Sequence, residues 1–201
     1  MNEQEIEVKF FVRDLKMIEL HLLELKAQLI QPRVHELNFR YDLPDGSMRS
    51  SGHVLRIRQD AVATITYKGP SLLTDGVFSR VELETEIGDF TTAQKILEAL
   101  GYVKILTYEK FRAVYELDGF HFMLDELPYG NFVEIEGADG AGLREMSARL
   151  GLNIEAAVGA GYARIFEDYN SRHGHASSDL IFDALRGKVP SPEELNLRPA
   201  D

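Results

Sequence analysis

Alternation of polar and apolar residues is the commonest pattern along this chain. It is clearest over residues 5–13, where Glu5, Glu7 and Lys9 fall on one face of an extended segment, with apolar residues between them. Similar runs bounded by turn-forming Gly, Pro, Asp or Ser predict strands at 34–42, 54–59, 63–68, 78–87, 106–117, 120–126 and 132–137. The pattern therefore predicts eight strands and a largely β fold.

Helical spacing interrupts the strands at three places. Apolar residues recur every three or four positions over 15–29, after Asp14, whose side chain suits an N-cap. A second helix is predicted to start at a cap formed by Asp89 or Thr91, and a third covers 143–150. Because these helices lie between or after the strands, they are expected to cover the outside of the sheet.

The C-terminal part of the sequence has a different character. Residues 171–201 combine Gly, Ser, Pro and scattered charge around a short apolar segment at 180–185. Before residue 170 no internal repeat or change of composition marks a boundary. We therefore predict one domain over residues 1–170, followed by a tail over residues 171–201 that is either helical or disordered.

Composition and charge exclude several classes of function. The 201 residues include 44% hydrophobic and 27% charged residues, as in an ordinary globular protein, and contain no cysteine, which excludes disulfides and thiolate metal sites. The net charge of −11 opposes nonspecific attraction to nucleic acids and anionic membranes. The acidic start at residues 1–5 does not resemble a secretory signal, and no apolar stretch approaches the about 20 residues that span a bilayer. A cytoplasmic location is expected.

Charged residues on the polar strand faces come mainly in pairs of one sign. The acidic ones are Glu5, Glu7, Glu82, Glu84, Glu86, Asp125, Glu134 and Glu136, and the basic ones are Lys9, Arg56, Arg58, Lys68, Arg80, Lys110 and Arg112. Like charges two residues apart on a strand repel one another unless opposite charges or a ligand compensate them. The pairing indicates that something neutralises these faces.

Two arrangements of these faces remain open from spacing alone. In an open antiparallel sheet, the charged face is simply solvated. In a closed eight-stranded barrel, the same face points inward, where carboxylates suit Mg²⁺ or Mn²⁺ and arginine and lysine side chains suit phosphates. No Gly-rich phosphate loop of the Walker or dinucleotide-binding type occurs. Any phosphate site must therefore use side chains.

A set of ordered motifs resembles the CYTH superfamily, also called the triphosphate tunnel metalloenzymes. They are Glu5-Ile-Glu7-Val-Lys9, Leu55-Arg-Ile-Arg58, Tyr67-Lys-Gly-Pro70, Arg80-Val-Glu-Leu-Glu84, Glu109-Lys-Phe-Arg112, Leu124-Asp-Glu-Leu-Pro128 and Phe132-Val-Glu-Ile-Glu136. The resemblance covers about residues 3–170 and implies an α+β fold, in which an eight-stranded antiparallel barrel forms a tunnel with helices packed outside. It favours the closed barrel over the open sheet.

The resemblance also implies roles for individual residues. The expected ligands of Mg²⁺ or Mn²⁺ would be Glu5, Glu7, Asp125, Glu134 and Glu136. Phosphate binding would fall to Lys9, Arg56, Arg58, Lys68, Arg80, Lys110 and Arg112. The residues nearest to catalysis would be Glu5, Glu7, Lys9, Lys68, Glu82 and Glu84, of which the last two would hold a second metal, position water or balance charge.

Three activities are compatible with such a site. A metal-dependent triphosphatase acting on tripolyphosphate or a small organic triphosphate comes first, since no residue set for an adenine and ribose pocket is evident. A class IV adenylyl cyclase and a noncatalytic polyphosphate- or nucleotide-binding module are the alternatives. The expected partner is a small-molecule triphosphate, with no nucleic acid or membrane, and a homodimer is left open.

Two features depart from the family pattern. The chain continues after Phe166, where family members tend to end, and Asn38 and Arg40 stand in a segment where many relatives place an acidic residue. Both departures bear on the choice of substrate.

Overall fold

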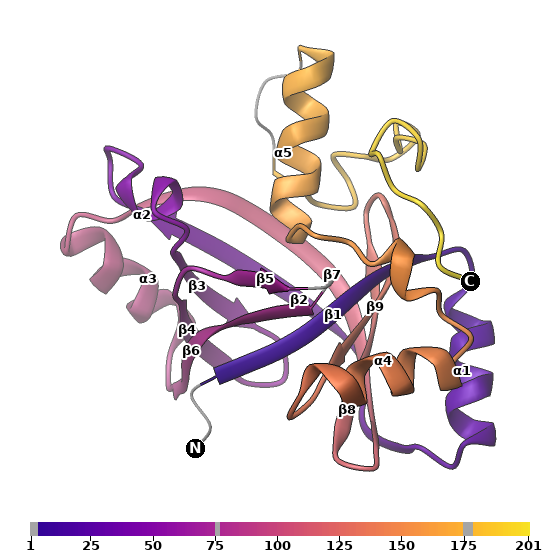
Figure 1. Ribbon diagram of the computed structural model, residues 1–201. Helices are drawn as coiled ribbons and strands as arrows, with labels where there is room; N and C mark the ends of the chain where they lie inside the picture. Colours follow the sequence, from indigo (N-terminus) through magenta and orange to yellow (C-terminus); the bar gives the residue numbers. More distant parts are fainter. Residues whose placement is uncertain (1–3, 75–76, 175–178) are drawn as a thin grey trace.

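The computed structural model describes residues 4–74, 77–174 and 179–201 (Figure 1). The elements are β1 (Gln4–Val12), α1 (Leu15–Glu24), β2 (Gln28–Asp42), α2 (Ser47–Ser50), β3 (Val54–Gln59), β4 (Ala63–Lys68), β5 (Leu72–Thr74), β6 (Val77–Ile87), α3 (Phe90–Ala99), β7 (Val103–Leu117), β8 (Phe120–Leu127), β9 (Gly130–Glu136), α4 (Gly140–Arg149), a 3₁₀ turn (Ile154–Ala156) and α5 (Tyr162–His173). No helix of the described residues is both long and apolar enough to cross a membrane.

The strands form a closed antiparallel barrel. Their order is β1-β9-β8-β7-β2-β3-β4-β6, and β6 pairs with β1 to complete the ring. Closure is possible because β6 uses residues 82–87 against β4 and residues 78–81 against β1. The eight-stranded antiparallel barrel inferred from the sequence is confirmed, and the short strand β5 is an addition that pairs with β6.

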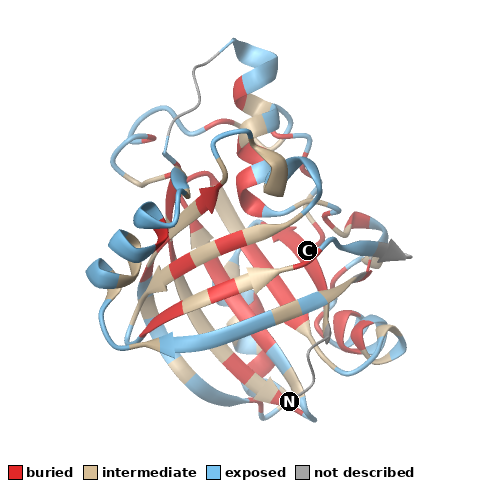
Figure 2. Cartoon of the chain, turned by 90° about the vertical axis from the view of Figure 1, so that its left-hand side faces the viewer, coloured by how far each residue is buried: buried red, intermediate tan, exposed pale blue. Residues whose placement is uncertain are grey.

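The barrel keeps its polar side chains inside and packs its apolar side chains outward against helices. Along β1, Glu7 and Lys9 face the interior, whereas the fully buried Val8 and Phe10 belong to a core that also contains residues of α1 and α4. Figure 2 shows how buried residues alternate with less buried ones along the strands. The apolar core thus lies around the barrel wall, which leaves the interior to charged groups.

The first helix predicted from the sequence, over residues 15–29, extends five residues beyond the end of α1. Helix α1 ends at Glu24, Lys26 takes a left-handed conformation with φ 65°, and β2 begins at Gln28. The apolar spacing continues to Leu29, but this residue instead pairs with β7 and is 49% exposed. The register of β2 against β7 shifts between residues 29 and 34, around Pro32, where the missing N–H is tolerated.

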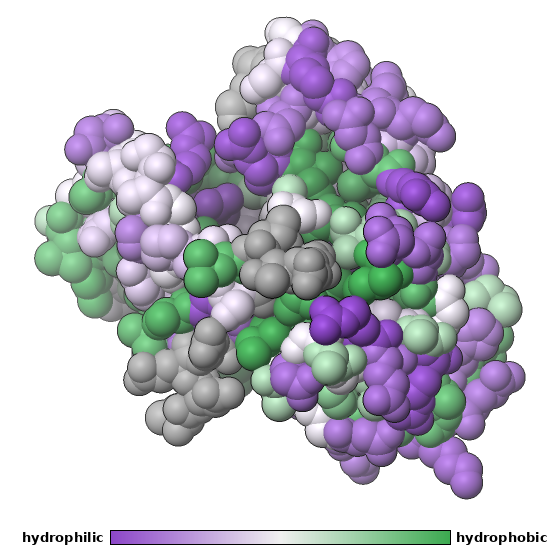
Figure 3. Space-filling view, viewed as in Figure 1, coloured by the Kyte–Doolittle hydropathy of each residue, from purple (hydrophilic) through white to green (hydrophobic). Residues whose placement is uncertain are grey.

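The other helices follow local capping signals to different extents. Asp89 accepts a hydrogen bond from the Thr92 N–H at 2.6 Å and starts α3, and Asp139 caps α4 in the same way. Helix α5 was not predicted, and it stands over one end of the barrel (Figure 1). In and just after α3, the side chains of Ile96 and Leu100 are more than half exposed. Figure 3 shows apolar residues at the surface on the side of the molecule where α3 lies.

Residues 179–201 pack against the barrel without forming a helix. The Leu180 side chain is fully buried, its N–H donates to the Thr107 carbonyl at 2.8 Å, and the Ala200 N–H donates to the Phe11 carbonyl at 2.9 Å. Helix α5 itself runs past residue 170, to His173. Residues 175–178 of the expected tail lie outside the described residues, and the division of the chain at residue 170 stays a prediction.

Candidate active site

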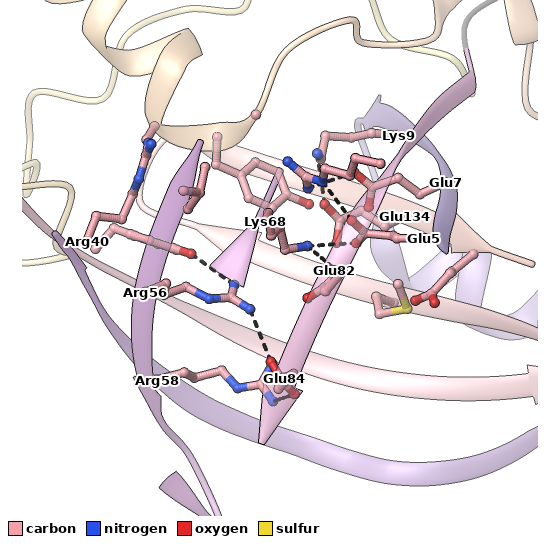
Figure 4. A pocket seen from close by; sticks show the side chains of 18 of the residues that line it. Glu5, Glu7, Lys9, Arg40, Arg56, Arg58, Lys68, Glu82, Glu84 and Glu134 are labelled. Carbon is pink, nitrogen blue, oxygen red and sulfur yellow. Dashed lines mark hydrogen bonds and ion pairs between the residues drawn. The ribbon is translucent and has the colours of Figure 1, made fainter. Parts of the chain in front are cut away.

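A cavity of about 740 Å³ occupies the barrel interior. Its walls include every residue that the sequence analysis assigned to the site except Asp125. The predicted residues that line it are Glu5, Glu7, Lys9, Arg56, Arg58, Lys68, Arg80, Glu82, Glu84, Lys110, Arg112, Glu134 and Glu136. The strand faces that alternate in sequence therefore converge on one space (Figure 4).

Glu5 is the centre of a small ionic network. One of its oxygens accepts a hydrogen bond from Lys68 Nζ at 2.7 Å, and the other accepts one from Arg80 Nε at 2.7 Å. Lys68 also contacts Glu82 at 2.8 Å. Burial opposes ionisation, but Lys68 and Arg80 lower the pKa of Glu5 to about 2. Burial raises the pKa of Glu82 to about 7, and the neighbouring Glu5 carboxylate contributes to that rise against the opposing effect of Lys68.

Glu7 and Glu136 lie where negative charge is in excess. Burial raises the pKa of Glu7, and Glu134 and Glu5 raise it further against the opposing effect of Lys9. Burial also raises the pKa of Glu136, with Glu5 and Glu7 as the next causes. Such shifts identify carboxylates that an additional cation would stabilise in the ionised form.

A buried set of ion pairs lies beside these carboxylates. Lys9 Nζ contacts Glu134 at 2.8 Å, and Arg112 donates to the same carboxylate. Asp125 is fully buried and accepts hydrogen bonds from Lys110 at 2.9 Å and from Arg112 at 2.6 Å. Because Asp125 lies behind the basic residues rather than on the cavity wall, it is placed to orient them. Its proposed role as a metal ligand stays a prediction.

The arginines of β3 form the basic wall of the cavity. Arg56 donates to the Tyr108 hydroxyl and to Thr66 Oγ1, both at 3.2 Å. Arg58 donates to Glu84 at 3.1 Å, and the second oxygen of Glu84 accepts a hydrogen bond from Thr66 at 2.6 Å. These contacts hold both guanidinium groups at the cavity surface (Figure 4).

Several residues of the barrel interior are not among those predicted from the sequence. Glu36 is 1% exposed and lies between Lys110 and Arg112, at 3.5 and 3.7 Å. Burial opposes ionisation of Glu36, but Lys110 and Arg112 lower its pKa to about 2. The sequence does contain a pattern that identifies Glu36 and Arg40 as interior residues, since both fall on one face of the predicted strand at 34–42.

Two tyrosines complete the wall. Tyr108 comes from β7 and Tyr162 from the first turn of α5. The Tyr162 ring lies under the Lys9 ammonium group, 4.4 Å from the ring centroid, and its hydroxyl donates to Asp125 at 2.8 Å. No pattern of the sequence places α5 against the barrel interior, so Tyr162 could not be assigned to the site.

The chemistry of the acidic residues suits a hard divalent cation, although they are not assembled as a ready ligand set. Among the described residues, no group of three acidic or histidine side chains is close enough to hold a metal. Glu5 and Glu134 are engaged with lysine and arginine, whereas Glu7 and Glu136 have raised pKa values. This pattern fits Mg²⁺ or Mn²⁺ bound by one or two carboxylates together with water and phosphate oxygens.

Comparison with known proteins decides the family. The model of the CYTH domain matches residues 3–144. The chain belongs to the CYTH family. It is 28% identical over 135 residues to adenylate cyclase CyaB of Aeromonas hydrophila, a match covering 65% of this chain and 67% of that protein.

Solved structures share the fold of this chain. A protein from Vibrio parahaemolyticus has a TM-score of 0.73 and 21% identity, with 83% of this chain and 99% of that chain covered. A Hippeastrum protein reported with a dominant triphosphatase activity has a TM-score of 0.60 and 22% identity, with 86% and 97% covered. At these identities the two matches establish the fold alone.

Proposed function

We propose that this CYTH chain is a divalent-metal-dependent phosphohydrolase that cleaves inorganic tripolyphosphate or a small organic or nucleoside triphosphate. The observation that carries the proposal is the cavity itself, in which arginines and lysines from several strands face carboxylates across one space. Such an arrangement matches a chain of phosphoryl groups with a bound cation better than it matches a neutral or apolar ligand.

The basic residues bind and orient the phosphate chain in this proposal. Arg56 and Arg58 present planar guanidinium groups that can each donate two hydrogen bonds to one phosphoryl group. Lys9 and Lys68 add point charges near the acidic wall of the cavity. This wall consists of the carboxylates of Glu5, Glu7, Glu134 and Glu136. As charge grows on the transferring phosphoryl oxygens, these preorganised cations stabilise it more than they stabilise the bound substrate.

Glu7 and Glu136 are the residues we assign first to a divalent cation, with Glu5 and Glu134 able to join when substrate rearranges their ion pairs. When bound, Mg²⁺ or Mn²⁺ would supply charge neutralisation at the phosphoryl oxygens and would orient them. The raised pKa values of Glu7 and Glu136 support this assignment, because cation binding favours their ionised forms.

Glu82 is the residue we propose to handle the proton of the attacking water. Burial raises its pKa to about 7, where a carboxylate can accept a proton near neutral pH. Its contact with Lys68 at 2.8 Å keeps the carboxylate in a fixed position at the cavity wall. Glu84 is held by Arg58 and Thr66, so we assign it to positioning the basic wall.

Adenylyl cyclase is a second candidate. The relative from Aeromonas hydrophila is named for that activity, and a cavity of about 740 Å³ has room for a nucleotide. Against it, the two tyrosines at the cavity wall already have partners: Lys9 lies over the Tyr162 ring, and Arg56 binds the Tyr108 hydroxyl. The Hippeastrum protein with this barrel is reported with a dominant triphosphatase activity, so the fold is compatible with hydrolysis.

Product analysis separates these functions. The purified protein is incubated with tripolyphosphate, ATP or thiamine triphosphate in the presence of Mg²⁺ or Mn²⁺, and phosphate, pyrophosphate and cyclic AMP are resolved. Release of phosphate, abolished by chelation of the metal, supports the triphosphatase. Cyclic AMP with pyrophosphate would instead establish the cyclase, and binding without any product would establish a noncatalytic module.

A further inference from the structure

Arg40 is a charged residue of the cavity wall that lacks a counterion. It lies on β2 directly opposite Arg56 of β3, and both side chains line the cavity (Figure 4). Within the described parts of the chain, no hydrogen bond or ion pair reaches its guanidinium group. Directly opposed residues of an antiparallel pair lie about 4.5–5.5 Å apart at Cα, so two arginines there repel each other.

The nearest carboxylates along β2, those of Asp42 and Glu36, already bind other groups. Asp42 accepts hydrogen bonds from the backbone N–H groups of Leu43 at 2.7 Å and Met48 at 3.0 Å, at the start of α2. Glu36 lies between Lys110 and Arg112, beyond the reach of Arg40 along the strand. No negative charge on this strand is therefore available to Arg40.

The residues around Arg56 do not supply a free carboxylate for Arg40 either. Glu84 is the carboxylate nearest to Arg56, at 3.6 Å, and its oxygens are already bound by Arg58 and Thr66. Asn38, two residues before Arg40 on the same strand, is fully buried and uncharged, and neither atom of its amide group has a partner. Among the residues that the structure describes, no free carboxylate is therefore paired with Arg40, and a bound anion would neutralise its positive charge.

We infer that Arg40 is a selectivity residue that favours inorganic tripolyphosphate over triphosphates with one esterified end. The inference rests on the proposed function, in which the terminal phosphoryl group is attacked beside the acidic wall. The opposite end of the phosphate chain then faces Arg40 and Arg56. In tripolyphosphate that end is a second, doubly charged terminal phosphoryl group, whereas in ATP it is an ester with a single charge.

Two matched variants test this role. Arg40→Gln removes the unpaired charge, and Arg186→Gln removes an arginine outside the cavity that is paired with Asp183 at 2.8 Å and is 84% exposed. Steady-state kinetics with metal and calorimetric affinities without metal are measured for tripolyphosphate and for ATP. Arg40→Gln is expected to raise KM and Kd for tripolyphosphate about tenfold or more, as for loss of a hydrogen bond to a charged group. Both constants for ATP should change by about twofold at most, and Arg186→Gln should leave the affinities for both ligands unchanged.

The outcomes separate this inference from the proposed function. Equal losses for the two ligands, or no loss for either, would overturn the role of Arg40. A wild-type protein that hydrolyses neither compound would reject the phosphohydrolase. In that case the calorimetric affinities still decide: selective weakening of tripolyphosphate binding upholds the assignment of Arg40, and its absence removes it.

Discussion

The Tyr162 hydroxyl donates a hydrogen bond to Asp125 across 2.8 Å, and this contact joins helix α5 to the charged interior of the barrel. Asp125 is fully buried and Tyr162 is 8% exposed. Burial raises the pKa of Tyr162 well above its usual range, and the Asp125 carboxylate raises it further. Tyr162 therefore remains a hydrogen-bond donor at neutral and mildly alkaline pH.

Replacing Tyr162 with Phe should destabilise the fold. The substitution leaves one oxygen of a buried carboxylate with fewer donors, which costs about 1–3 kcal/mol. Urea denaturation followed by circular dichroism measures the free energy of unfolding. The control is Tyr41→Phe, because no described residue forms a hydrogen bond with the buried Tyr41 hydroxyl, so its removal should leave stability unchanged or increased. Equal losses in both variants would show that the hydroxyl contact with Asp125 contributes nothing.

Asp125→Asn distinguishes an orienting role from a metal-binding role. The substitution leaves Lys110 and Arg112 without the carboxylate that they share in the interior. The variant should therefore lose about 3–5 kcal/mol of stability in metal-free buffer. A residue that serves only as a metal ligand would show a loss only when Mg²⁺ or Mn²⁺ is present. Unchanged stability in the presence of a chelator would therefore reject the orienting role.

Much of the barrel could be predicted from local pattern, because strand geometry alone fixes which residues share a face. Glu5, Glu7 and Lys9 alternate with residues of the outer core, and the structure places all three on the cavity wall. Local pattern does not predict the correct element where the same residues fit both a helix and a strand. The spacing to Leu29 suits a helix, yet pairing with β7 draws residues 28–42 into a strand.

The details of the site depend on contacts that no local pattern contains. Asp125 has the same alternation as Glu134, but only the closed barrel shows that Lys110 and Arg112 separate Asp125 from the cavity. Tyr162 reaches the interior because α5 stands over one end of the barrel. Its role follows from the tertiary position of a helix rather than from spacing along a strand.

Acid should weaken the fold through Glu36. Its pKa is about 2 in the folded protein against an ordinary value of 4.5, so its ion pairs stabilise the fold fully above pH 4.5 and are lost as the pH falls toward 2. The lowering of this pKa corresponds to about 3 kcal/mol of folding free energy. Glu36→Gln should therefore reduce the loss of unfolding free energy over this window. An unchanged pH dependence in urea denaturation would contradict the role of Glu36.

Glu82 acts in the opposite direction at higher pH. Its pKa is raised to about 7, so its contribution to stability is fully present below pH 4.5 and is lost as the pH rises through 7. Stability measured between pH 4.5 and 7 should consequently fall less steeply with rising pH in Glu82→Gln than in the wild-type protein. Identical slopes would show that this carboxylate has an ordinary pKa.

Kinetics of two site variants should separate metal binding from phosphate binding. Glu7→Gln should raise the metal concentration for half-maximal rate and lower kcat, because the neutral amide is a poorer ligand. Arg58→Ala should mainly raise KM, by about tenfold, through loss of a charged hydrogen bond to phosphate. Glu145→Gln, on the exposed face of α4, is the control. Near-wild-type constants for both site variants would remove Glu7 and Arg58 from the site.

The packing of residues 179–201 predicts that they fold together with the barrel. Leu180 is fully buried, and its backbone pairs with Thr107 and Glu109 of β7. Leu180→Ala should cost about 2–5 kcal/mol through lost burial and the cavity left behind. Thermal denaturation should retain a single transition, shifted to lower temperature. A separate transition, or an unshifted one, would show that this segment is independent of the barrel.

The most direct test of a triphosphate site in the barrel is a crystal structure of the protein with tripolyphosphate and Mn²⁺, recorded with anomalous scattering. The account predicts three phosphoryl groups inside the cavity, beside Arg56 and Arg58, with the manganese signal next to Glu7 and Glu136. Phosphate density confined to the outer surface, with the interior ion pairs unchanged at saturating ligand, would contradict it.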